Sequence, residues 1–425
     1  MKVLVIGSGG REHALAWKIS QSPLLTELHA APGSPAIATL ATCHGVPVSD
    51  LDGLVDLARQ AAIDLVVVGP ENPLCDGLAD RLNAAGIAVF GPSEKAARLE
   101  GSKAFAKDFY ARHNVPTARY GTFSDAAEAK AFLDTMTPPY VLKADGLAAG
   151  KGVVIVESRS DAEEEIDAFL SGKFGEASQT LVIEEFMSGE EVSIFALCDG
   201  DTVMFCGAAQ DHKRVGEGDT GLNTGGMGAY SPAPIATPEL IEAAMQTIIE
   251  PVARGLAAEG TPFRGVLFAG LMVTPDGPKT VEFNIRFGDP ECQVVMTRLA
   301  GDILPYLKAC ASGGLAELEP VNWSPDPAMT VVMAANGYPG SYQKGSVIGG
   351  VDDANAMQGV VVFEAGTARD EAGQRTASGG RVLNVTATGE SLHYAADRAY
   401  AAIDLIDWPD GFCRRDIGWR ALKTH

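Results

Sequence analysis

The chain has 425 residues, of which 46% are hydrophobic and 21% are charged, and 33 Lys and Arg against 55 Asp and Glu give it a formal charge of −22. This composition is ordinary for a folded globular protein of about three domains, and it excludes a disordered or collagen-like chain. Such an acidic chain is expected to repel nucleic acid and anionic membranes, although basic groups that converge locally can still bind phosphorylated small molecules.

Neither a membrane span nor a signal peptide is expected. No apolar run reaches the ~18 residues of a membrane span, and glycines from Gly7 onward interrupt the apolar start at residues 3–6. The seven cysteines include no C-x-x-C pair, so reduced thiols are expected in place of disulfides or a cysteine-rich zinc site. We expect a cytoplasmic monomer that binds neither nucleic acid nor membrane.

The first hundred residues alternate apolar runs with helical patterns. Strands are expected at 3–6, 65–68 and 87–90, with an Ala- and Leu-rich helix from about residue 12. Continuous apolar strands that alternate with helices are typical of a parallel sheet covered on both faces.

Beyond residue 101 the pattern mixes short strands and helices. The expected elements are a helix over 102–113, a helix introduced by the capping box Ser160–Glu163, a helix near 238–258, and a hairpin of strands 266–273 and 280–285 around Pro275-Asp276-Gly277. After a loop rich in Pro and Trp, residues 328–425 are expected to form a separate α/β unit.

The first motif, Gly7-Ser8-Gly9-Gly10-Arg11-Glu12, lies between a strand and a helix. This placement suits a phosphate at a helix N-terminus, and the alternative is a tight turn that only packs helix on strand. Glu12 stands where a dinucleotide fingerprint has its third glycine, and no acid follows a second strand, so NAD binding is disfavoured.

The second motif is the loop between two strands in residues 141–154, which contains Lys143, Gly146, Gly150, Lys151 and Gly152. Glycines let backbone N–H groups approach phosphate oxygens, and lysines neutralise the charge. A flexible hairpin with solvated lysines is the alternative. A third segment, 210–228, is polar and glycine-rich, and a loop of this length is usually functional.

The fourth motif is the strand that contains Glu282, Asn284 and Arg286. Residues two apart in a strand share a face, so these three side chains are expected to point one way, with Phe283 and Ile285 opposite. Carboxylate and amide oxygens suit Mg²⁺, and the arginine could bind a phosphate or carboxylate. The alternative is an exposed polar face with an ion pair. Together the four motifs indicate ATP-driven activation of a substrate.

The motifs resemble the phosphoribosylamine–glycine ligase family of the ATP-grasp superfamily. The resemblance covers the whole chain, and the segments that carry it are 101–105, 142–153, 183–186, 211–214, 223–230, 286–291, 379–383 and 413–420. It implies a Rossmann-like N-terminal domain at 1–101, an ATP-grasp region at 102–315 with a lid subdomain at about 120–188, and a C-terminal α/β domain at 328–425. The implied reaction joins glycine to 5-phosphoribosylamine with ATP, through glycyl phosphate, in purine biosynthesis.

The resemblance also implies roles for individual residues. Those implied at ATP are Lys103, Lys143, Gly146, Gly150, Lys151, Gly152, Glu184, Glu185, Met187 and Glu191. Glu282 and Asn284 are implied as ligands of Mg²⁺ or Mn²⁺, and the implied catalytic residues are Arg286, Asp211 and Lys213. The residues expected at phosphoribosylamine and glycine are Gly9, Gly10, Arg11, Glu71, Asn223, Thr224 and Gly225. Glu71 is included because it follows a parallel strand, where α/β sheets usually hold ligands.

The chain departs from the family pattern at Leu222, Cys292 and Glu364, where Pro, Thr and His are usual, and none of the three is expected to touch the metal or phosphate residues. Another ATP-grasp carboxylate–amine ligase would keep Lys103, Lys143 and Glu282 but change the substrate loop. A catalytically dead nucleotide sensor would lack the metal pair, which is present.

Overall fold

The computed structural model describes residues 1–147, 152–173, 175 and 179–423. Its N-terminal part is a five-stranded parallel sheet with the strand order β3-β2-β1-β4-β5. The strands are β1 Lys2–Gly7, β2 Glu27–Pro32, β3 Thr42–Cys43, β4 Leu65–Val68 and β5 Ala88–Phe90. The helices between and after them are α1 Gly10–Ile19, α2 Leu51–Gln60, α3 Glu71–Cys75, α4 Leu78–Ala84 and α5 Glu94–Gly101. The predicted parallel sheet is confirmed, and its carboxyl edge carries both the glycine-rich turn and Glu71.

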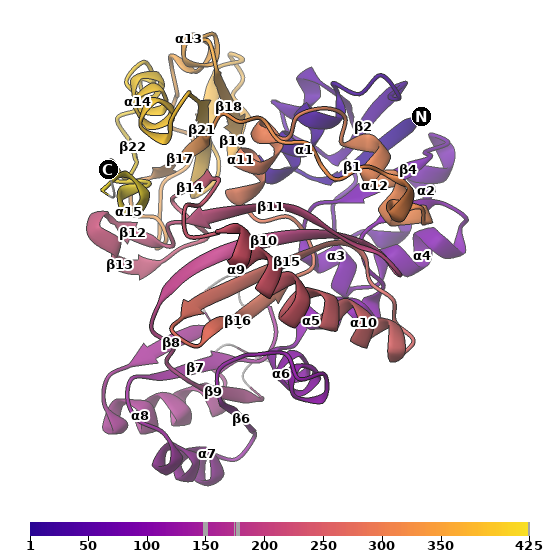
Figure 1. Ribbon diagram of the computed structural model, residues 1–425. Coiled ribbons are helices and arrows are strands. Elements are labelled where there is room, and N and C mark those ends of the chain that lie inside the picture. Colours follow the sequence, from indigo (N-terminus) through magenta and orange to yellow (C-terminus); the bar gives the residue numbers. More distant parts are fainter. Residues whose placement is uncertain (148–151, 174, 176–178, 424–425) are drawn as a thin grey trace.

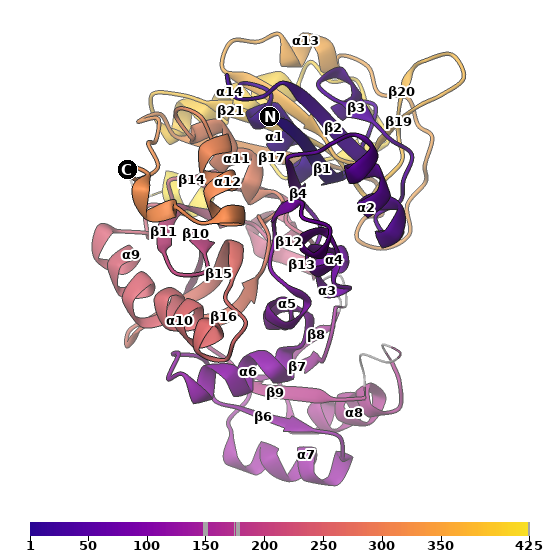
Figure 2. The ribbon, with the colours of Figure 1, turned by 90° about the vertical axis from the view of Figure 1, so that its right-hand side faces the viewer.

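A small lobe follows, which lies at the bottom of Figures 1 and 2. Its four-stranded sheet has the order β6-β9-β7-β8, with β6 Tyr120–Phe123, β7 Tyr140–Ala144, β8 Val153–Val156 and β9 Leu181–Glu185. Helices α7 Ala126–Phe132 and α8 Arg159–Leu170 pack on this sheet around a core that includes Ile166 and Phe169. The predicted capping box is wrong by two residues, because Ser158 and not Ser160 caps α8 through the N–H of Asp161.

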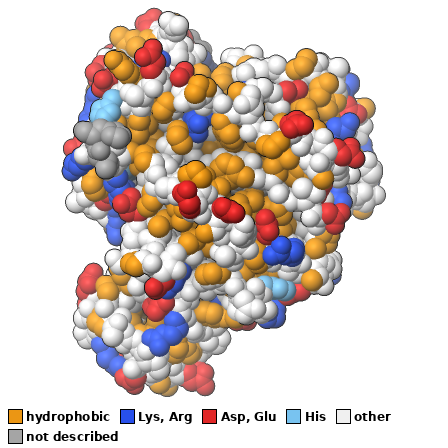
Figure 3. Space-filling view, viewed as in Figure 1, with side chains coloured by type: hydrophobic (Ala, Val, Ile, Leu, Met, Phe, Trp, Pro, Cys, Tyr) orange, Lys and Arg blue, Asp and Glu red, His pale blue; other side chains and the backbone are white. Residues whose placement is uncertain are grey.

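Helix α6 Lys103–Arg112 connects the two parts. It begins after Ser102, whose Oγ accepts a hydrogen bond from the N–H of Phe105, and it ends at Arg112, within one residue of the predicted end at 113 and before Pro116. Figure 3 shows the molecular surface hollowed where the small lobe joins the rest of the molecule.

A nine-stranded sheet forms the centre of the molecule, with the order β16-β15-β10-β11-β14-β17-β21-β18 and β22 paired to β17. Its strands are β10 Glu190–Asp199, β11 Val203–Asp211, β14 Gly228–Ser231, β15 Arg264–Thr274, β16 Gly277–Asn284, β17 Ala328–Ala335, β18 Val360–Glu364, β21 Arg381–Thr388 and β22 Gly411–Phe412. The predicted β15–β16 hairpin is confirmed. Because β17 pairs with β14, the C-terminal segment extends the central sheet and does not form a separate one.

Helices cover this sheet and join it to the N-terminal part. The helices are α9 Pro238–Ala244, a π-helical turn at Met245–Ile249, α10 Glu250–Ala258, α11 Glu291–Arg298, α12 Leu304–Ser312, α13 Val351–Asn355, α14 Leu392–Ile403 and α15 Trp419–Leu422. Helix α11 packs on α1, and Phe90 stacks on Phe287 with ring centroids 6.0 Å apart. This packing places the glycine-rich turn beside residues 287–291. No described helix is long and apolar enough to cross a membrane.

Two small hairpins complete the fold. One is formed by β19 Thr367–Arg369 and β20 Arg375–Ala377. The other, β12 Arg214–Gly216 with β13 Thr220–Asn223, lies within the segment that was expected to be a loop. The pairing of these two strands corrects that expectation. The sequence did not indicate strands here because the hairpin is mostly exposed and shows no alternation of apolar and polar residues.

Candidate active site

The end of strand β16 brings together the three predicted polar residues. Phe283 and Ile285 are buried on the opposite face, as alternation along a strand requires. Arg286 lies just beyond the strand, and its Nη2 donates to Asn284 Oδ1 at 3.0 Å. The strand therefore presents Glu282, Asn284 and the guanidinium at one edge of the central sheet.

Arg286 is held by carboxylates from the N-terminal part. Its Nη2 lies 2.8 Å from Glu100 Oε1, and its Nε lies 3.1 Å from Glu71 Oε2. The second oxygen of Glu100 accepts the N–H of Ile285 at 2.8 Å. Burial raises the pKa of Glu100 despite this partner. Glu100 is a residue that the sequence reasoning missed, because it is the penultimate residue of an ordinary helix and lies 186 positions from Arg286.

Three lysines act on the carboxylate of Glu282, one from α6, one from β7 and one from the turn between β11 and β12. Partial removal from water favours the neutral acid and raises the pKa of Glu282. The ammonium groups of Lys213, Lys143 and Lys103 outweigh that effect, so the pKa is lowered. The group is therefore an ionised carboxylate among cations, which is a suitable environment for phosphate oxygens and a divalent metal.

The small lobe contributes a buried ion cluster around Glu184. Lys143 Nζ lies 2.9 Å from Glu184 Oε1, and Lys107 Nζ lies 3.1 Å from Oε2. Burial lowers the pKa of Lys107 to about 8. Lys107 was not predicted, since a lysine in the middle of a helix gives no sign that it is buried. The Glu184 carboxylate is therefore paired with one lysine on each of its oxygens.

The start of the glycine-rich loop is fastened to the start of α6. Asp145 accepts hydrogen bonds from Ser102 Oγ and from the N–H of Ala104, both at 3.2 Å, and Lys103 Nζ donates to Gly146 O at 2.9 Å. On the far side of the loop, Gly152 O accepts the N–H of Ala144 at 2.8 Å. Gly150 and Lys151 lie outside the described residues.

A second charged group lies where β11 ends. Lys213 forms an ion pair with Glu191, and the charges of Glu191 and Asp211 raise the pKa of Lys213 although burial works against it. Burial also raises the pKa values of Asp211 and Glu291, and the charge of Glu191 adds to this effect at Asp211, as the charge of Asp211 does at Glu291. Glu291 accepts a hydrogen bond from Ser193 Oγ at 3.3 Å. The sequence motif contained Glu291, but no role was predicted for it.

The raised pKa of Glu291 predicts a pH-dependent stability difference. A carboxyl whose folded-state pKa is raised binds more protons when folded, so its ionisation destabilises the fold above that pKa and has no effect below the ordinary value. Glu291→Gln is therefore expected to stabilise the protein relative to wild type by roughly 1–3 kcal/mol near pH 8 and by little near pH 5. Denaturant unfolding across this pH range measures the difference. A gain that does not change with pH, or one matched by the exposed-site control Glu242→Gln, would contradict the assignment.

The glycine-rich turn predicted to bind phosphoribosylamine lies beside the loop that follows β16. The N–H of Gly9 donates to Glu12 Oε2 at 2.7 Å, and the Glu12 side chain also lies against Gly69, where a Cβ would come within 2.1 Å of Oε1. Glu12 thus accepts the N–H of Gly9 at this helix N-terminus, and the binding of a phosphate by Gly9, Gly10 and Arg11 stays a prediction. Arg11 crosses to Phe287 O at 3.2 Å, so it joins the glycine-rich turn to the arginine loop.

The loop with Asn223, Thr224 and Gly225 is fastened by C-terminal side chains. Tyr338 Oη accepts the N–H of Gly225 at 3.1 Å. Arg381 Nη1 donates to Gly225 O and to Asp289 O, both at 2.6 Å, and so connects this loop to the one that follows β16. Arg381 lies in the motif 379–383, which contributed to the resemblance, but no role was predicted for Arg381 or for Tyr338.

The three departures from the family pattern lie in different surroundings. Leu222 is 66% exposed on β13, and the buried Glu364 lies 3.0 Å from Arg375 Nε. Cys292 is buried, with its Sγ 3.8 Å from Arg11 O. The expectation that none touches a candidate phosphate residue is therefore wrong for Cys292, whose contact is to the Arg11 backbone.

Comparison with known proteins gives matches along the length of the chain. Residues 1–100, 101–292 and 328–420 match the N domain, the ATP-grasp (A) domain and the C domain of phosphoribosylglycinamide synthetase. The chain is 58% identical over 422 residues to a phosphoribosylamine–glycine ligase of Mesorhizobium japonicum, with 99% of both chains covered. It is 57% identical to one of Caulobacter vibrioides, with 100% of this chain and 99% of that one covered.

Solved structures give the same fold. The phosphoribosylamine–glycine ligase of Thermotoga maritima superposes with a TM-score of 0.85 at 32% identity, covering 98% of this chain and 100% of that one. A biotin carboxylase domain of Hydrogenobacter thermophilus superposes with a TM-score of 0.74 at 19% identity, covering 97% and 91%. The second likeness shows the fold alone.

Proposed function

The chain belongs to the phosphoribosylglycinamide synthetase family and is an ADP-forming carbon–nitrogen ligase, and on this premise we propose how its residues carry out the reaction. The reaction joins glycine to 5-phosphoribosylamine and yields glycinamide ribonucleotide, ADP and phosphate in de novo purine biosynthesis. The observation that supports the proposal most strongly is the position of Glu282, Asn284 and Arg286 beside three lysines.

Glycine must be activated before it can be transferred, because a free carboxylate has no adequate leaving group. We infer that its carboxylate attacks the terminal phosphate of ATP and forms glycyl phosphate with release of ADP. The amine of phosphoribosylamine then attacks the acyl carbon, loses a proton and displaces phosphate. The protein contributes positioning and charge neutralisation, as in other phosphoryl transfers.

Oxygen transfer tests this route directly. With both carboxylate oxygens of glycine labelled with ¹⁸O, one label is expected in the released phosphate and the other in the amide product. Mass spectrometry of the phosphate gives the result. Phosphate without label would exclude the acyl phosphate, and absence of any product from glycine and phosphoribosylamine would exclude the proposed substrates.

The residues present fit a divalent metal whose remaining ligands come from the substrate and water. Glu282 and Asn284 offer one carboxylate and one amide oxygen on the same strand face, and Mg²⁺ typically takes one or two protein oxygens together with phosphate oxygens and water. Among the described residues no group of three or more His, Cys, Asp or Glu side chains could hold a metal alone. Mg²⁺ or Mn²⁺ bound there would neutralise phosphate charge.

Two lysines and the residues at the adenine complete the proposed ATP site. Lys103 and Lys143 neutralise the phosphates, beside Gly146 and Gly152 at the two described ends of the glycine-rich loop. Met187 and Glu185 lie at the adenine, and Glu191 accepts the ribose hydroxyls, for which it must exchange its ion pair with Lys213.

The acceptor substrate is placed between the N-terminal part and the central sheet, where Glu71 pairs with Arg286. Glu71→Ala is expected to raise the KM for phosphoribosylamine by about tenfold, the effect of losing one charge-assisted hydrogen bond. The KM for ATP should stay within about twofold, since Glu71 is not among the residues assigned to ATP. Steady-state kinetics with each substrate varied in turn measures both constants. The surface variant Asp56→Ala serves as control, and a rise confined to the KM for ATP would reject the assignment.

The remaining proposals concern the molecule as a whole. We propose a cytoplasmic monomer with domains at 1–101, 102–315 and 328–425 and a lid at about 120–188. The sheet orders support the first boundary and the lid, because the parallel sheet and the four-stranded sheet each end within these ranges.

A further inference from the structure

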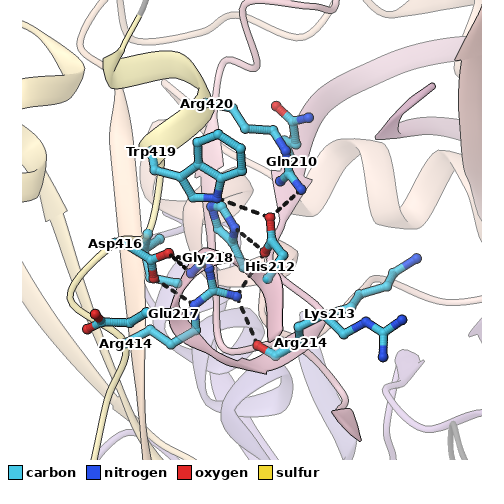
Figure 4. A network of polar contacts seen from close by, with 12 residues as sticks. Gln210, His212, Lys213, Arg214, Glu217, Gly218, Arg414, Asp416, Trp419 and Arg420 are labelled. Carbon is cyan, nitrogen blue, oxygen red and sulfur yellow. Dashed lines mark hydrogen bonds and ion pairs between the residues drawn. The ribbon is translucent and has the colours of Figure 1, made fainter. Parts of the chain in front are cut away.

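The segment Asp211-His212-Lys213 separates two environments. Lys213 forms an ion pair with Glu191, and the charges of Glu282 and Glu291 also act on Asp211 and Lys213. His212, between them, faces the opposite side and is buried against the C-terminal segment 414–420. In Figure 4 the side chain of Lys213 extends away from this segment, whereas the His212 ring lies among Asp416, Trp419 and Arg414.

Both nitrogens of the His212 ring face named groups. Nε2 lies 2.7 Å from the backbone N of Gly418, which can only donate, so Nε2 must be the acceptor. The ring proton is then on Nδ1, which lies 3.6 Å from Asp219 Oδ1. The C-terminal segment therefore holds His212 by a hydrogen bond, and the carboxylate of Asp219 at the tip of the β12–β13 hairpin lies near the other ring nitrogen, which makes no hydrogen bond.

Asp219 is the point where the hairpin tip is fastened to the C-terminal segment. Its φ is +57°, a conformation that residues other than Gly, Asn and Asp seldom adopt. Its carboxylate accepts hydrogen bonds from Arg414 Nη1 at 3.0 Å, from Trp419 Nε1 at 3.1 Å and from Arg420. These donors replace the water contacts that a carboxylate at an exposed hairpin tip would otherwise keep.

Arg414 connects the remaining parts of the network. The guanidinium is buried, lies 2.8 Å from both oxygens of Asp416, and donates to Arg214 O at 2.9 Å. Asp416 in turn accepts the N–H of Gly218 at 2.8 Å. One side chain thus binds the strand that follows Lys213, the hairpin tip and the C-terminal segment.

The hairpin needs this fastening because its own surface is largely exposed. At its base, the N–H of Thr224 donates to Lys213 O at 2.8 Å. This hydrogen bond joins the two ends of the hairpin, which carry the candidate active-site residues Lys213 and Thr224. A lysine side chain has four rotatable bonds, and the position of its ammonium group depends on a fixed backbone. Displacement of that backbone by about 1 Å can cost ~10²-fold in rate.

We propose that His212, Asp219 and Arg414 are positioning residues through which the C-terminal segment 414–420 holds Asp211 and Lys213 in the geometry needed for acyl transfer. None of the three contacts Glu282, Asn284 or Arg286, so each acts through the backbone of residues 211–214. The inference rests on the proposed function, since it assigns a purpose to the placement of Lys213 in that reaction.

Paired variants of His212 test the inference. His212→Leu removes both polar contacts, whereas His212→Gln keeps an oxygen that can accept the N–H of Gly418. We expect His212→Leu to lower kcat by ~10–100-fold, His212→Gln to recover most of that loss, and the calorimetric affinity for ADP to stay within about twofold in both, since the nucleotide residues lie on other elements. An unchanged kcat, no recovery by Gln, or an ADP affinity that falls together with kcat would overturn the proposal.

A second pair keeps the test valid if His212→Leu does not fold. Asp219→Asn tolerates the positive φ and keeps the side-chain size, but it removes the charge that Arg414 and Arg420 face. It should lower kcat without a loss of ADP affinity, and an unchanged kcat would overturn the proposal. Arg415→Met is the matched control in the same segment, because that side chain forms an exposed pair with Asp404, and kcat should not change. A wild-type protein without ligase activity would refute the proposed function, which separates that failure from failure of this inference.

Discussion

Glu282→Gln is expected to lower kcat by at least ~10²-fold while the protein remains folded, because this carboxylate is the charged oxygen ligand proposed for the metal. The substitution keeps the size of the side chain but leaves Lys103, Lys143 and Lys213 without the anion that their charges surround. Their mutual repulsion then increases, and the metal is left with neutral amide oxygens in place of a charged carboxylate. The concentration of Mg²⁺ that gives half-maximal rate should rise by ~10–100-fold.

Two measurements distinguish loss of metal from loss of structure. Binding of ADP, titrated by calorimetry with and without Mg²⁺, should show a strong metal effect in the wild type and a weak one in Glu282→Gln. Asp276→Asn is the matched control, because Asp276 lies in the turn at the other end of the same β15–β16 hairpin. A metal effect on ADP binding as large in Glu282→Gln as in the wild type would contradict the assignment of this carboxylate.

The parts of the fold that depend on local pattern were predictable. Apolar runs gave β1, β4 and β5, and the Pro275-Asp276-Gly277 turn gave the β15–β16 hairpin. The start of α8 was misplaced because Ser158 and Ser160 both stand three residues before an acidic residue. Ser158 is the cap in the structure because its Oγ accepts the N–H of Asp161.

The parts that depend on distant pairing were not predictable from one sequence. The pairing of β17 with β14 joins residues about a hundred positions apart, and no local signal distinguishes it from a separate sheet. The same holds for Glu100 on Arg286 and for Arg381 on Gly225. The candidate site could therefore be recognised through its strand face and its lysines, but the carboxylates that hold the arginine and the C-terminal groups that hold the loops required the structure.

Arg286→Ala is expected to lower kcat by ~10²–10³-fold, which is the usual cost of losing one preorganised donor to a developing negative charge. The guanidinium lies next to the proposed metal ligands and carries donors on both the Nε and Nη2 sides. In the reaction it would contact the transferred phosphoryl group and the oxygen of the acyl intermediate. Arg254→Ala, which removes an exposed arginine from α10, is the control for loss of positive charge.

The loss in Arg286→Ala has two sources, and they can be separated. Without the guanidinium, the buried Glu100 and the partly buried Glu71 lose their common cation, which should destabilise the protein as well as the transition state. Arg286→Lys restores the charge between the two carboxylates but cannot donate along two directions in one plane. If Arg286 acts on the reaction, single-turnover rates measured well below the unfolding temperature should stay low in Arg286→Lys even though its stability recovers. If the rate recovers together with the stability, Arg286 serves only to hold Glu71 and Glu100, and the charge of the acyl intermediate must be met by Lys213 or Lys143.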